Sequence, residues 1–259
     1  MPGDQHRVVA ERAQLEAEVH RLVAAGARLG APVRVLGSIG VAMHCPDSAS
    51  LIERFARTYA DIDFAAYRRD ANNVRNILGA AGYVEDREVT INSEGRRAIF
   101  DDPRTGTHVD VFFDELEFCH TISLTGRLEA DQPTIPLAEL LLSKLQIVRL
   151  NEKDAIDACL LLLDHDLGTG DVDVIDIGRI RRICADDWGF WRTLTLNLDK
   201  VRALAEGYAQ LSGPQRERIV AASHEVKRAI DDAPKSLGWR MRDRVGDRRQ
   251  WWTDVDEAR

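Results

Sequence analysis

The spacing of apolar and polar residues changes character about halfway along the chain. Between residues 34 and 114, short apolar runs alternate with turn residues, which is typical of strands and short helices. The elements predicted in this half are helices over 7–29, 39–43, 49–59 and 70–82, strands over 33–36 and 61–67, and a hairpin with arms over 96–101 and 108–114.

From about residue 136 onward, apolar positions recur at helical spacing. Pro133 and Pro136 mark the change, and one long helical stretch is expected over Leu137–Asp166, ending at Gly168. Further helices are expected over 173–187, 190–211, 214–232 and 236–247. We therefore predict an α+β protein, with a mixed-sheet domain over residues 1–135 followed by an all-helical domain over residues 136–259.

Composition narrows the functional classes. The formal net charge of −8 excludes a basic module that coats nucleic acid. No stretch reaches the roughly 18–20 apolar residues that span a bilayer, and Met1 to Arg12 carries no apolar run of the kind found in a secretory signal. The four cysteines form no CxxC pair, so we expect a reduced, cytoplasmic protein that does not contact membranes.

Three acidic residues stand out because they lie within strongly apolar strands. Asp61 and Asp63 alternate with Ile62 and Phe64, so both carboxylates point to one face of their strand. Asp110 lies in the apolar run over 108–114, and the three carboxylates converge if the two strands are neighbours. Like charges so close together are costly unless a cation neutralises them, and three carboxylate oxygens suit octahedral Mg²⁺.

A second feature is the pair Gly37-Ser38, which follows a strand and opens a helix. The first N–H groups of such a helix, together with a hydroxyl, can bind phosphate oxygens. Glycine also lets the backbone approach a ligand closely. The sequence therefore predicts a site for phosphate beside a site for metal.

These motifs, in this order, resemble the DNA polymerase β-type nucleotidyltransferase superfamily. The matching segments are LGS at 36–38, DIDF at 61–64 and VDVF at 109–112. The segment LLSKLQ at 141–146, followed by Arg149, Lys153-Asp154 and Asp157, is similar to the AbiEii-like branch. The resemblance covers about residues 30–165. The gap from Ser38 to Asp61 is longer than the family usually shows, which leaves the acceptor open.

The resemblance implies roles for individual residues. Gly37 and Ser38 would hold the triphosphate of an NTP, and Lys144 would neutralise it. Asp61, Asp63 and Asp110 would be catalytic residues and ligands of Mg²⁺, with Mn²⁺ as the alternative metal. The implied reaction moves a nucleoside monophosphate to a hydroxyl or phosphate acceptor and releases pyrophosphate. The acceptors considered are a small molecule, the 3′ end of a tRNA and a protein side chain.

Other interpretations stay open at this point. The fold could serve a non-catalytic nucleotide-binding or partner-binding protein, or a metal-dependent phosphohydrolase that uses the same acids. Lys144 lies in an apolar helix and must either reach water or meet an anion. Arg149, Lys153 and Asp157 fit a salt-bridged surface stripe equally well.

Two further groups of residues have both a chemical and a structural interpretation. His44-Cys45 and Cys119-His120 suggest a zinc site, but adjacent ligands chelate poorly, and buried cysteines are the favoured interpretation. The segment 239–252 mixes arginines with aromatics, which suits RNA contact, although arginines paired with local aspartates are favoured. Trp188 and Trp191 are expected to anchor the core of the helical domain.

Overall fold

Residues 12–56, 59 and 61–254 are described by a computed structural model, in which the chain divides into two units. The first unit comprises Met1–Met43, Arg57–Glu115 and Ser123–Ile135, and the second comprises His44–Ala56, Leu116–Ile122 and Pro136–Arg259. Two segments, 44–56 and 116–122, thus group with the second unit although they precede residue 136 in the chain. The beginning of the predicted helix over 7–29, and residues 57 and 58 of the helix over 49–59, lie outside the described residues.

The first unit is built on a mixed five-stranded sheet with the order β1-β2-β5-β4-β3. Strands β2 and β5 are parallel, whereas the pairs β1–β2, β4–β5 and β3–β4 are antiparallel. The mixed α/β character and the predicted hairpin are confirmed. The strands are β1 (Arg34–Leu36), β2 (Asp61–Ala66), β3 (Val84–Asp86), β4 (Arg97–Asp101) and β5 (His108–Phe113).

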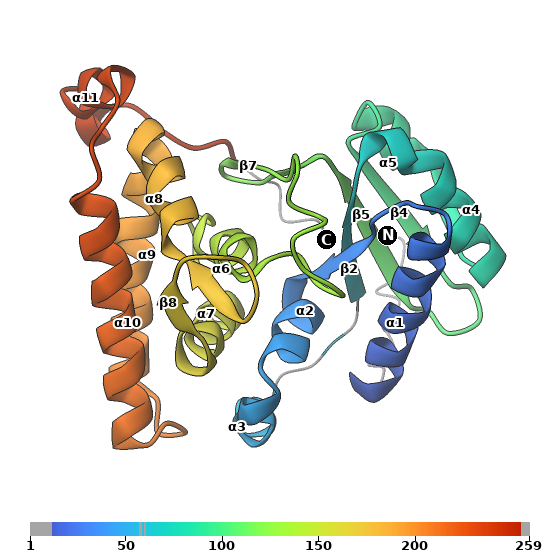
Figure 1. Ribbon diagram of the computed structural model, residues 1–259, viewed down its shortest axis with the longest axis horizontal. Coiled ribbons are helices and arrows are strands. Elements are labelled where there is room, and N and C mark those ends of the chain that lie inside the picture. Colours follow the sequence, from blue (N-terminus) through green and yellow to red (C-terminus); the bar gives the residue numbers. More distant parts are fainter. Residues whose placement is uncertain (1–11, 57–58, 60, 255–259) are drawn as a thin grey trace, which may run out of the picture. The chain divides into compact units, whose positions relative to one another are not determined.

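One face of this sheet is covered by α1 (Arg12–Arg28) and α4 (Ala71–Ala81) (Figure 1). Phe64 and Val111 point into this layer from β2 and β5, and Leu22 and Ile77 meet them from the helices. Their spacing explains the arrangement, because every second strand residue and every third or fourth helical residue faces the same way. The opposite face of the sheet carries Asp61, Asp63 and Asp110.

Short elements complete the first unit. Helix α2 (Gly37–His44) follows β1 directly, as predicted, and only its last residue groups with the second unit. Helix α5 (Arg87–Asn92) and strand β3 were not predicted, because each is at most six residues long and largely exposed. The side chain of Asp86 accepts hydrogen bonds from Glu88 N and Val89 N and so begins α5.

The helical second unit departs from the expected single stretch over Leu137–Asp166. That prediction is wrong, because α6 (Leu137–Leu145) and α7 (Glu152–Asp164) are separate helices. The side chain of Asn151 accepts a hydrogen bond from Asp154 N and thereby starts α7. After α7, the short strands β8 (Asp166–Gly168) and β9 (Val174–Asp176) pair in parallel, which the helical interpretation also missed.

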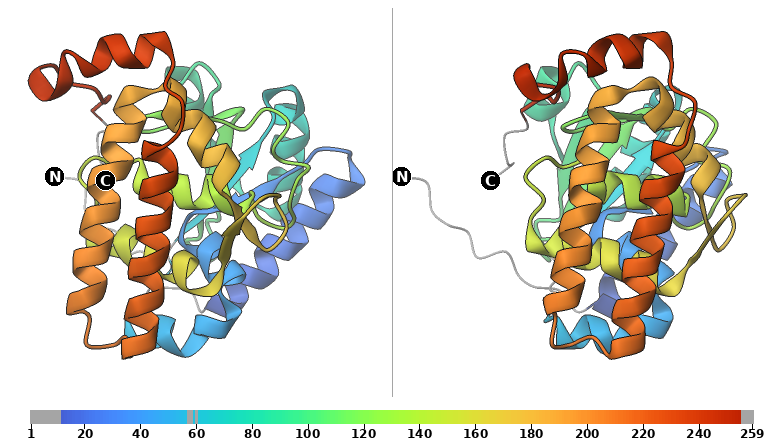
Figure 2. Two further views of the ribbon diagram at one scale, coloured as in Figure 1. Left: turned by 60° about the vertical axis from the view of Figure 1, so that its left-hand side comes forward. Right: turned by 90° about the vertical axis from the view of Figure 1, so that its left-hand side faces the viewer.

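Helices α8 (Ile177–Asp186), α9 (Trp188–Gly207), α10 (Gly213–Asp231) and α11 (Leu237–Asp243) pack with α6 and α7 into a bundle, in which α9 and α10 run side by side (Figure 2). Ile219, Val226 and Ile230 are fully buried on α10 at spacings of seven and four residues, as a packed helix face requires. The short helix α3 (Ala49–Arg54) also belongs to the second unit. Among the described residues, none of the helices combines the length and the apolar character needed to cross a bilayer.

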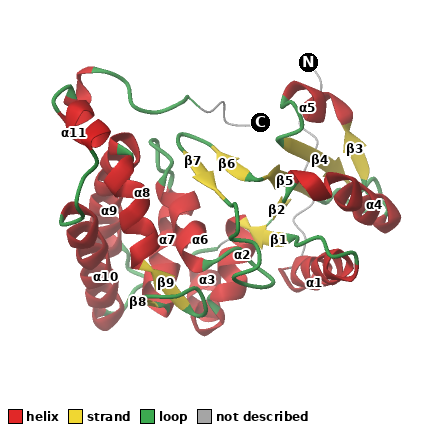
Figure 3. Cartoon of the chain, turned by 45° about the horizontal axis from the view of Figure 1, so that its top comes forward, coloured by secondary structure: helices red, strands yellow, loops and turns green. Residues whose placement is uncertain are grey.

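A two-stranded sheet of β6 (Glu115–Glu117) and β7 (Thr121–Ser123) forms the hairpin that Figure 3 shows in yellow. Within the second unit, Thr253 contacts this hairpin, because its backbone N–H donates a hydrogen bond to Cys119 O. Trp251 Nε1 donates to Thr193 Oγ1 at 3.0 Å. The described C-terminal residues are therefore held against the helical unit.

Candidate functional site

The three acids singled out in the sequence lie on one face of two neighbouring strands. Asp63 and Asp110 are register partners in the parallel pair β2–β5, and Asp61 lies opposite His108. Neighbouring strands are about 4.8 Å apart, and residues two apart on one strand are separated by about 6.6 Å. We call Asp61, Asp63 and Asp110 the carboxylate cluster.

Arg97 joins this cluster from strand β4. Its guanidinium donates to both carboxylate oxygens of Asp110, with Nε at 2.9 Å from each. The pair is largely enclosed, since 33% of the Arg97 side chain and 7% of the Asp110 side chain are exposed. The register of β4 against β5 brings Arg97 to the face of the sheet that also carries Asp110.

The electrostatics of Asp110 reflect this position. Burial raises the pKa of its carboxyl group, the hydrogen bonds and charge of Arg97 oppose that shift, and the nearby charge of Asp61 adds to it. The pKa of Arg97 is raised by its hydrogen bonds to Asp110, although burial lowers it. Asp63 also raises the pKa of Arg97 through its charge, so Arg97 lies within electrostatic reach of Asp63 as well as of Asp110.

Gly37 places the backbone against the same cluster. Its φ of +68° lies in the left-handed region that favours glycine. A Cβ atom at this position would lie 2.0 Å from Asp63 Oδ2, so no other residue fits without moving the carboxylate. The strand–Gly-Ser–helix arrangement predicted from the sequence is present, with Gly37 and Ser38 as the first residues of α2.

Sequence reasoning missed Arg97. The run over 96–101 was recognised as a hairpin arm, and its pairing with the run over 108–114 was expected. The missing information was the register. The pairing of Asp101 with His108 across a six-residue loop sets Ile99 opposite Asp110, and Arg97 is on the same face two residues away.

Lys144 lies in the second unit, and its ammonium group meets two carboxylates there. Nζ is 3.0 Å from Asp154 Oδ1 and 3.0 Å from Asp157 Oδ2. Burial alone would lower the pKa of Lys144, but the charges of Asp157 and Asp154 raise it above the ordinary value. The observed partners of this lysine are thus carboxylates of the adjoining helix α7, and its expected contact with a triphosphate stays a prediction. We call these three residues the buried lysine triad.

The histidine–cysteine pairs take up structural positions. Cys45 and Cys119 are both buried, as favoured from the sequence. The Nε2 atom of His120 is 2.8 Å from Thr193 Oγ1, and the ring of His44 packs edge-on against His165 with ring centroids 5.5 Å apart. These contacts favour the buried-cysteine interpretation over a zinc site.

The aromatic and basic residues near the C-terminus form a packed cluster in the second unit. Trp188 is buried, and its Nε1 donates to Asp243 at 2.7 Å. Arg242 stacks over the Trp188 ring at 4.4 Å and donates to the carbonyl oxygens of Gly246 and Arg249. The expectation that Trp188 anchors the helical core is confirmed, and Arg242 contributes to the same packing.

The residues of the carboxylate cluster are chemically suited to a divalent cation. Within residues 12–56, 59 and 61–254, no group of three or more His, Cys, Asp or Glu side chains is already arranged as a metal site. The oxygen atoms of Asp110 are directed to Arg97, which is consistent with that finding. The donors are nevertheless all hard oxygens, which Mg²⁺ prefers, and the absence of a side chain at Gly37 lets the carboxylate of Asp63 lie against the start of α2.

Comparison with known proteins adds no relative. No protein-family model matches the chain, and no curated protein matches it either.

Proposed function

We propose that this protein is a metal-dependent nucleotidyltransferase, which moves a nucleoside monophosphate from an NTP to a hydroxyl or phosphate acceptor and releases pyrophosphate. The observation that carries the proposal is the register of β2 against β5. It sets Asp63 beside Asp110, with Asp61 on the same face and the backbone of Gly37 against Asp63. The sequence resemblance to the DNA polymerase β-type superfamily involves these same residues.

In the proposed reaction, an acceptor oxygen attacks the α-phosphorus, and the bond from that phosphorus to the bridging oxygen breaks. Pyrophosphate takes the bonding electrons, and the acceptor proton passes to a carboxylate. Asp110 suits this role, because burial raises the pKa of its carboxyl group above that of an exposed aspartate. Gly37 and Ser38, at the start of α2, would orient the phosphates through backbone N–H groups and a hydroxyl.

Asp61 and Asp63, together with Asp110, would hold Mg²⁺, or Mn²⁺ in its place. When bound, the metal supplies positive charge that offsets the charge of the phosphates. The predicted contact of Lys144 with the triphosphate stays a prediction, since the observed partners of its ammonium are Asp154 and Asp157.

One observation favours a second candidate, a nucleotide-binding protein without catalysis. Arg97 occupies both oxygens of Asp110 with hydrogen bonds. A guanidinium in this place supplies fixed positive charge where a transferase of this type would use a cation. In this second candidate, the protein binds an NTP but does not consume it.

The test is incubation of the pure protein with Mg²⁺ and each α-labelled NTP, in separate reactions with total tRNA, a metabolite extract, or the protein alone. The Asp63→Asn variant is the control, since it removes charge and keeps shape. Label that moves to one fraction, and does not move with the variant, supports the transferase and identifies the acceptor class. Saturable NTP binding without transfer selects the second candidate, and the absence of NTP binding rejects both.

A further inference from the structure

A cavity of about 540 Å³ lies within the first unit, beyond the carboxyl ends of the parallel strands β2 and β5. Tyr67, Arg68 and Arg69 line it directly after β2, and Asp114 and Glu115 line it directly after β5. Its volume is in the range of small-molecule sites. The carboxyl ends of parallel strands are also where open α/β sheets commonly bind ligands.

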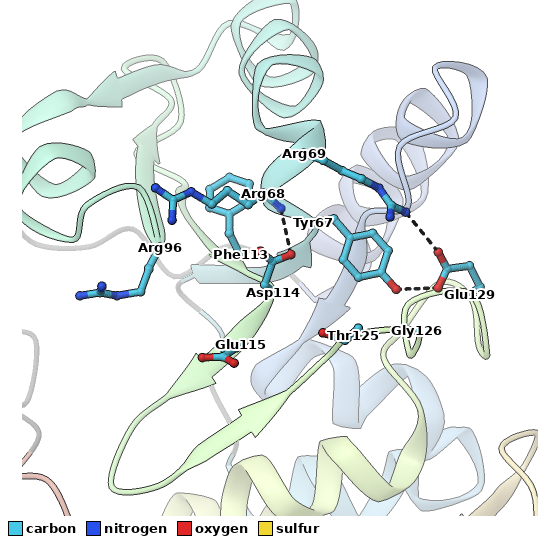
Figure 4. A pocket seen from close by; sticks show the side chains of 10 residues that line it. All are labelled: Tyr67, Arg68, Arg69, Arg96, Phe113, Asp114, Glu115, Thr125, Gly126 and Glu129. Carbon is cyan, nitrogen blue, oxygen red and sulfur yellow. Dashed lines mark hydrogen bonds and ion pairs between the residues drawn. The ribbon is translucent and has the colours of Figure 1, made fainter.

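Three guanidinium groups surround this cavity. Figure 4 shows Arg68 and Arg96 on one side and Arg69 on the other. Arg68 Nη2 donates to the carbonyl oxygen of Glu94 at 2.6 Å, which holds this side chain in place and engages one of its five N–H donors. Arg69 lies 4.4 Å from the centroid of the Tyr67 ring, which braces it in turn.

The acidic residues that line the cavity make different contacts. Asp114 has a φ of +63°, and its carboxylate accepts a hydrogen bond from Arg68 N at 3.1 Å, so it shapes the turn after β2. Glu129 accepts a hydrogen bond from Tyr67 Oη at 2.6 Å and lies 3.7 Å from Arg69 Nη2. Glu115 lies at the cavity wall, and none of the dashed contacts in Figure 4 involves it.

The combination of arginines, a carboxylate and aromatic rings indicates which chemical groups a ligand of this cavity would carry. Guanidinium groups bind phosphate oxygens through paired N–H donors. A carboxylate such as Glu115 instead needs a donor on the ligand, and hydroxyl groups of a sugar provide one. Tyr67 and Phe113 also line the cavity with aromatic rings. A phosphate attached to a sugar carries all of these features.

We infer that this cavity is a sugar-phosphate binding site, separate from the carboxylate cluster. Asp110 and Asp114 are four residues apart along one extended strand and its end, which corresponds to about 13 Å. The site does not depend on the proposed transfer reaction. The sugar phosphate is either a free metabolite or part of a nucleic-acid backbone, and both present the same groups.

The experiment is calorimetric titration of the full chain, without divalent metal, with two probes. One probe is ribose 5-phosphate, and the other is a short single-stranded oligoribonucleotide without a terminal phosphate. Binding of the first identifies a free metabolite as the source, and binding of the second alone identifies a nucleic-acid backbone. Either supports the inference, and the absence of binding by both overturns it.

The double variant Arg68→Gln with Arg96→Gln should weaken binding by about tenfold or more, because charged hydrogen bonds are lost. The matched control is Arg28→Gln with Arg87→Gln, which removes the same charge from exposed positions outside the cavity. An equal loss in both double variants would mean non-specific attraction and would reject the site.

Two more variants test where the sugar phosphate binds. Thr125→Trp places bulk at an exposed wall of the cavity and should block binding without touching the arginines. Asp63→Asn should leave sugar-phosphate binding within about twofold, because the change lies outside the cavity. Loss of binding in Asp63→Asn would show that the two sites are one and would reject the inference, whatever the outcome of the transfer assay.

Discussion

The carboxylate cluster and the buried lysine triad use the same chemistry in different surroundings. Each combines aspartates with one cationic side chain, Arg97 in the first and Lys144 in the second. In the triad, 10% of the Lys144 side chain and 2% of the Asp157 side chain are exposed, and all three residues belong to two adjoining helices. In the cluster, Asp61 and Asp63 are half-buried, and the backbone of Gly37 lies against one of them.

The two groups differ in how completely their charges are balanced within the protein. In the triad, the charges are removed from water, which is unfavourable. Opposite charges within hydrogen-bond distance offset that cost. The cluster gathers three acids on one sheet face and keeps a glycine where a side chain would collide. Three carboxylates on one face carry negative charge that a single guanidinium does not balance and that a bound cation would neutralise. Four substitutions test this contrast.

The largest effect is expected for Lys144→Met. Removal of the ammonium leaves Asp157 buried without its partner, which costs about 3–5 kcal/mol of unfolding free energy. Urea unfolding followed by tryptophan fluorescence measures this, since all five tryptophans belong to the second unit. The exposed neighbour Lys153→Met is the control and should change stability by less than about 0.5 kcal/mol. If both variants lost the same free energy of unfolding, Lys144 would not act as a structural charge partner, and the contrast between triad and cluster would fail.

Asp63→Asn should lower nucleotidyl transfer by about 10²–10³-fold, the usual effect of losing one well-placed electrostatic group. Its stability should stay within about 1 kcal/mol of the original protein, because the side chain is half-buried. Initial rates with labelled NTP, and urea unfolding, provide the two readouts. Asp101 lies on the same sheet face but is exposed, so the Asp101→Asn variant should catalyse nucleotidyl transfer at a rate within about twofold of the original protein. A rate of Asp63→Asn close to that of the control would remove Asp63 from the proposed mechanism.

Gly37→Ala should destabilise the first unit by about 3 kcal/mol, because strain at positive φ adds to a collision with Asp63. Gly30→Ala separates these causes. Gly30 has a φ of +67°, but a Cβ there would meet nothing within 4 Å, so only about 1 kcal/mol is expected. Thermal unfolding followed by circular dichroism compares the two. Equal losses of stability in the two variants would show that the collision between residue 37 and Asp63 adds no cost of its own.

The smallest effect is expected for Arg97→Gln, at about 2 kcal/mol of stability near pH 7, because the buried carboxylate of Asp110 loses its charged hydrogen bonds but a glutamine amide can still donate to it. Without the guanidinium, the pKa of Asp110, already raised by burial, rises further. A carboxyl whose folded-state pKa is raised contributes stability that is lost as the pH rises through that pKa. The deficit of the variant should therefore shrink as the pH falls toward the pKa of Asp110, in urea titrations at several pH values. A deficit independent of pH would mean that Arg97 acts through packing alone.

Some of the fold follows from local patterns in the sequence. The helix over Ala71–Ala81 ends where Gly82 takes a φ of 98°, and the strand over Asp61–Ala66 shows its alternation directly. The apolar stretch after Pro136 was harder to interpret, because apolar periodicity continues past the break at Gln146–Asn151. Only the side chain of Asn151, which caps α7, reveals that a second helix begins.

By itself, the sequence determined that Asp61 and Asp63 share a strand face and that Gly37-Ser38 joins a strand to a helix. Both depend on residues adjacent in the chain, for which backbone geometry leaves little choice. Only the tertiary structure decided that Asp110 pairs with Asp63, that Arg97 binds Asp110, and that Lys144 is matched by Asp154 and Asp157. These contacts depend on strand register and helix packing, which are set by the burial of many side chains at once and have no local signature.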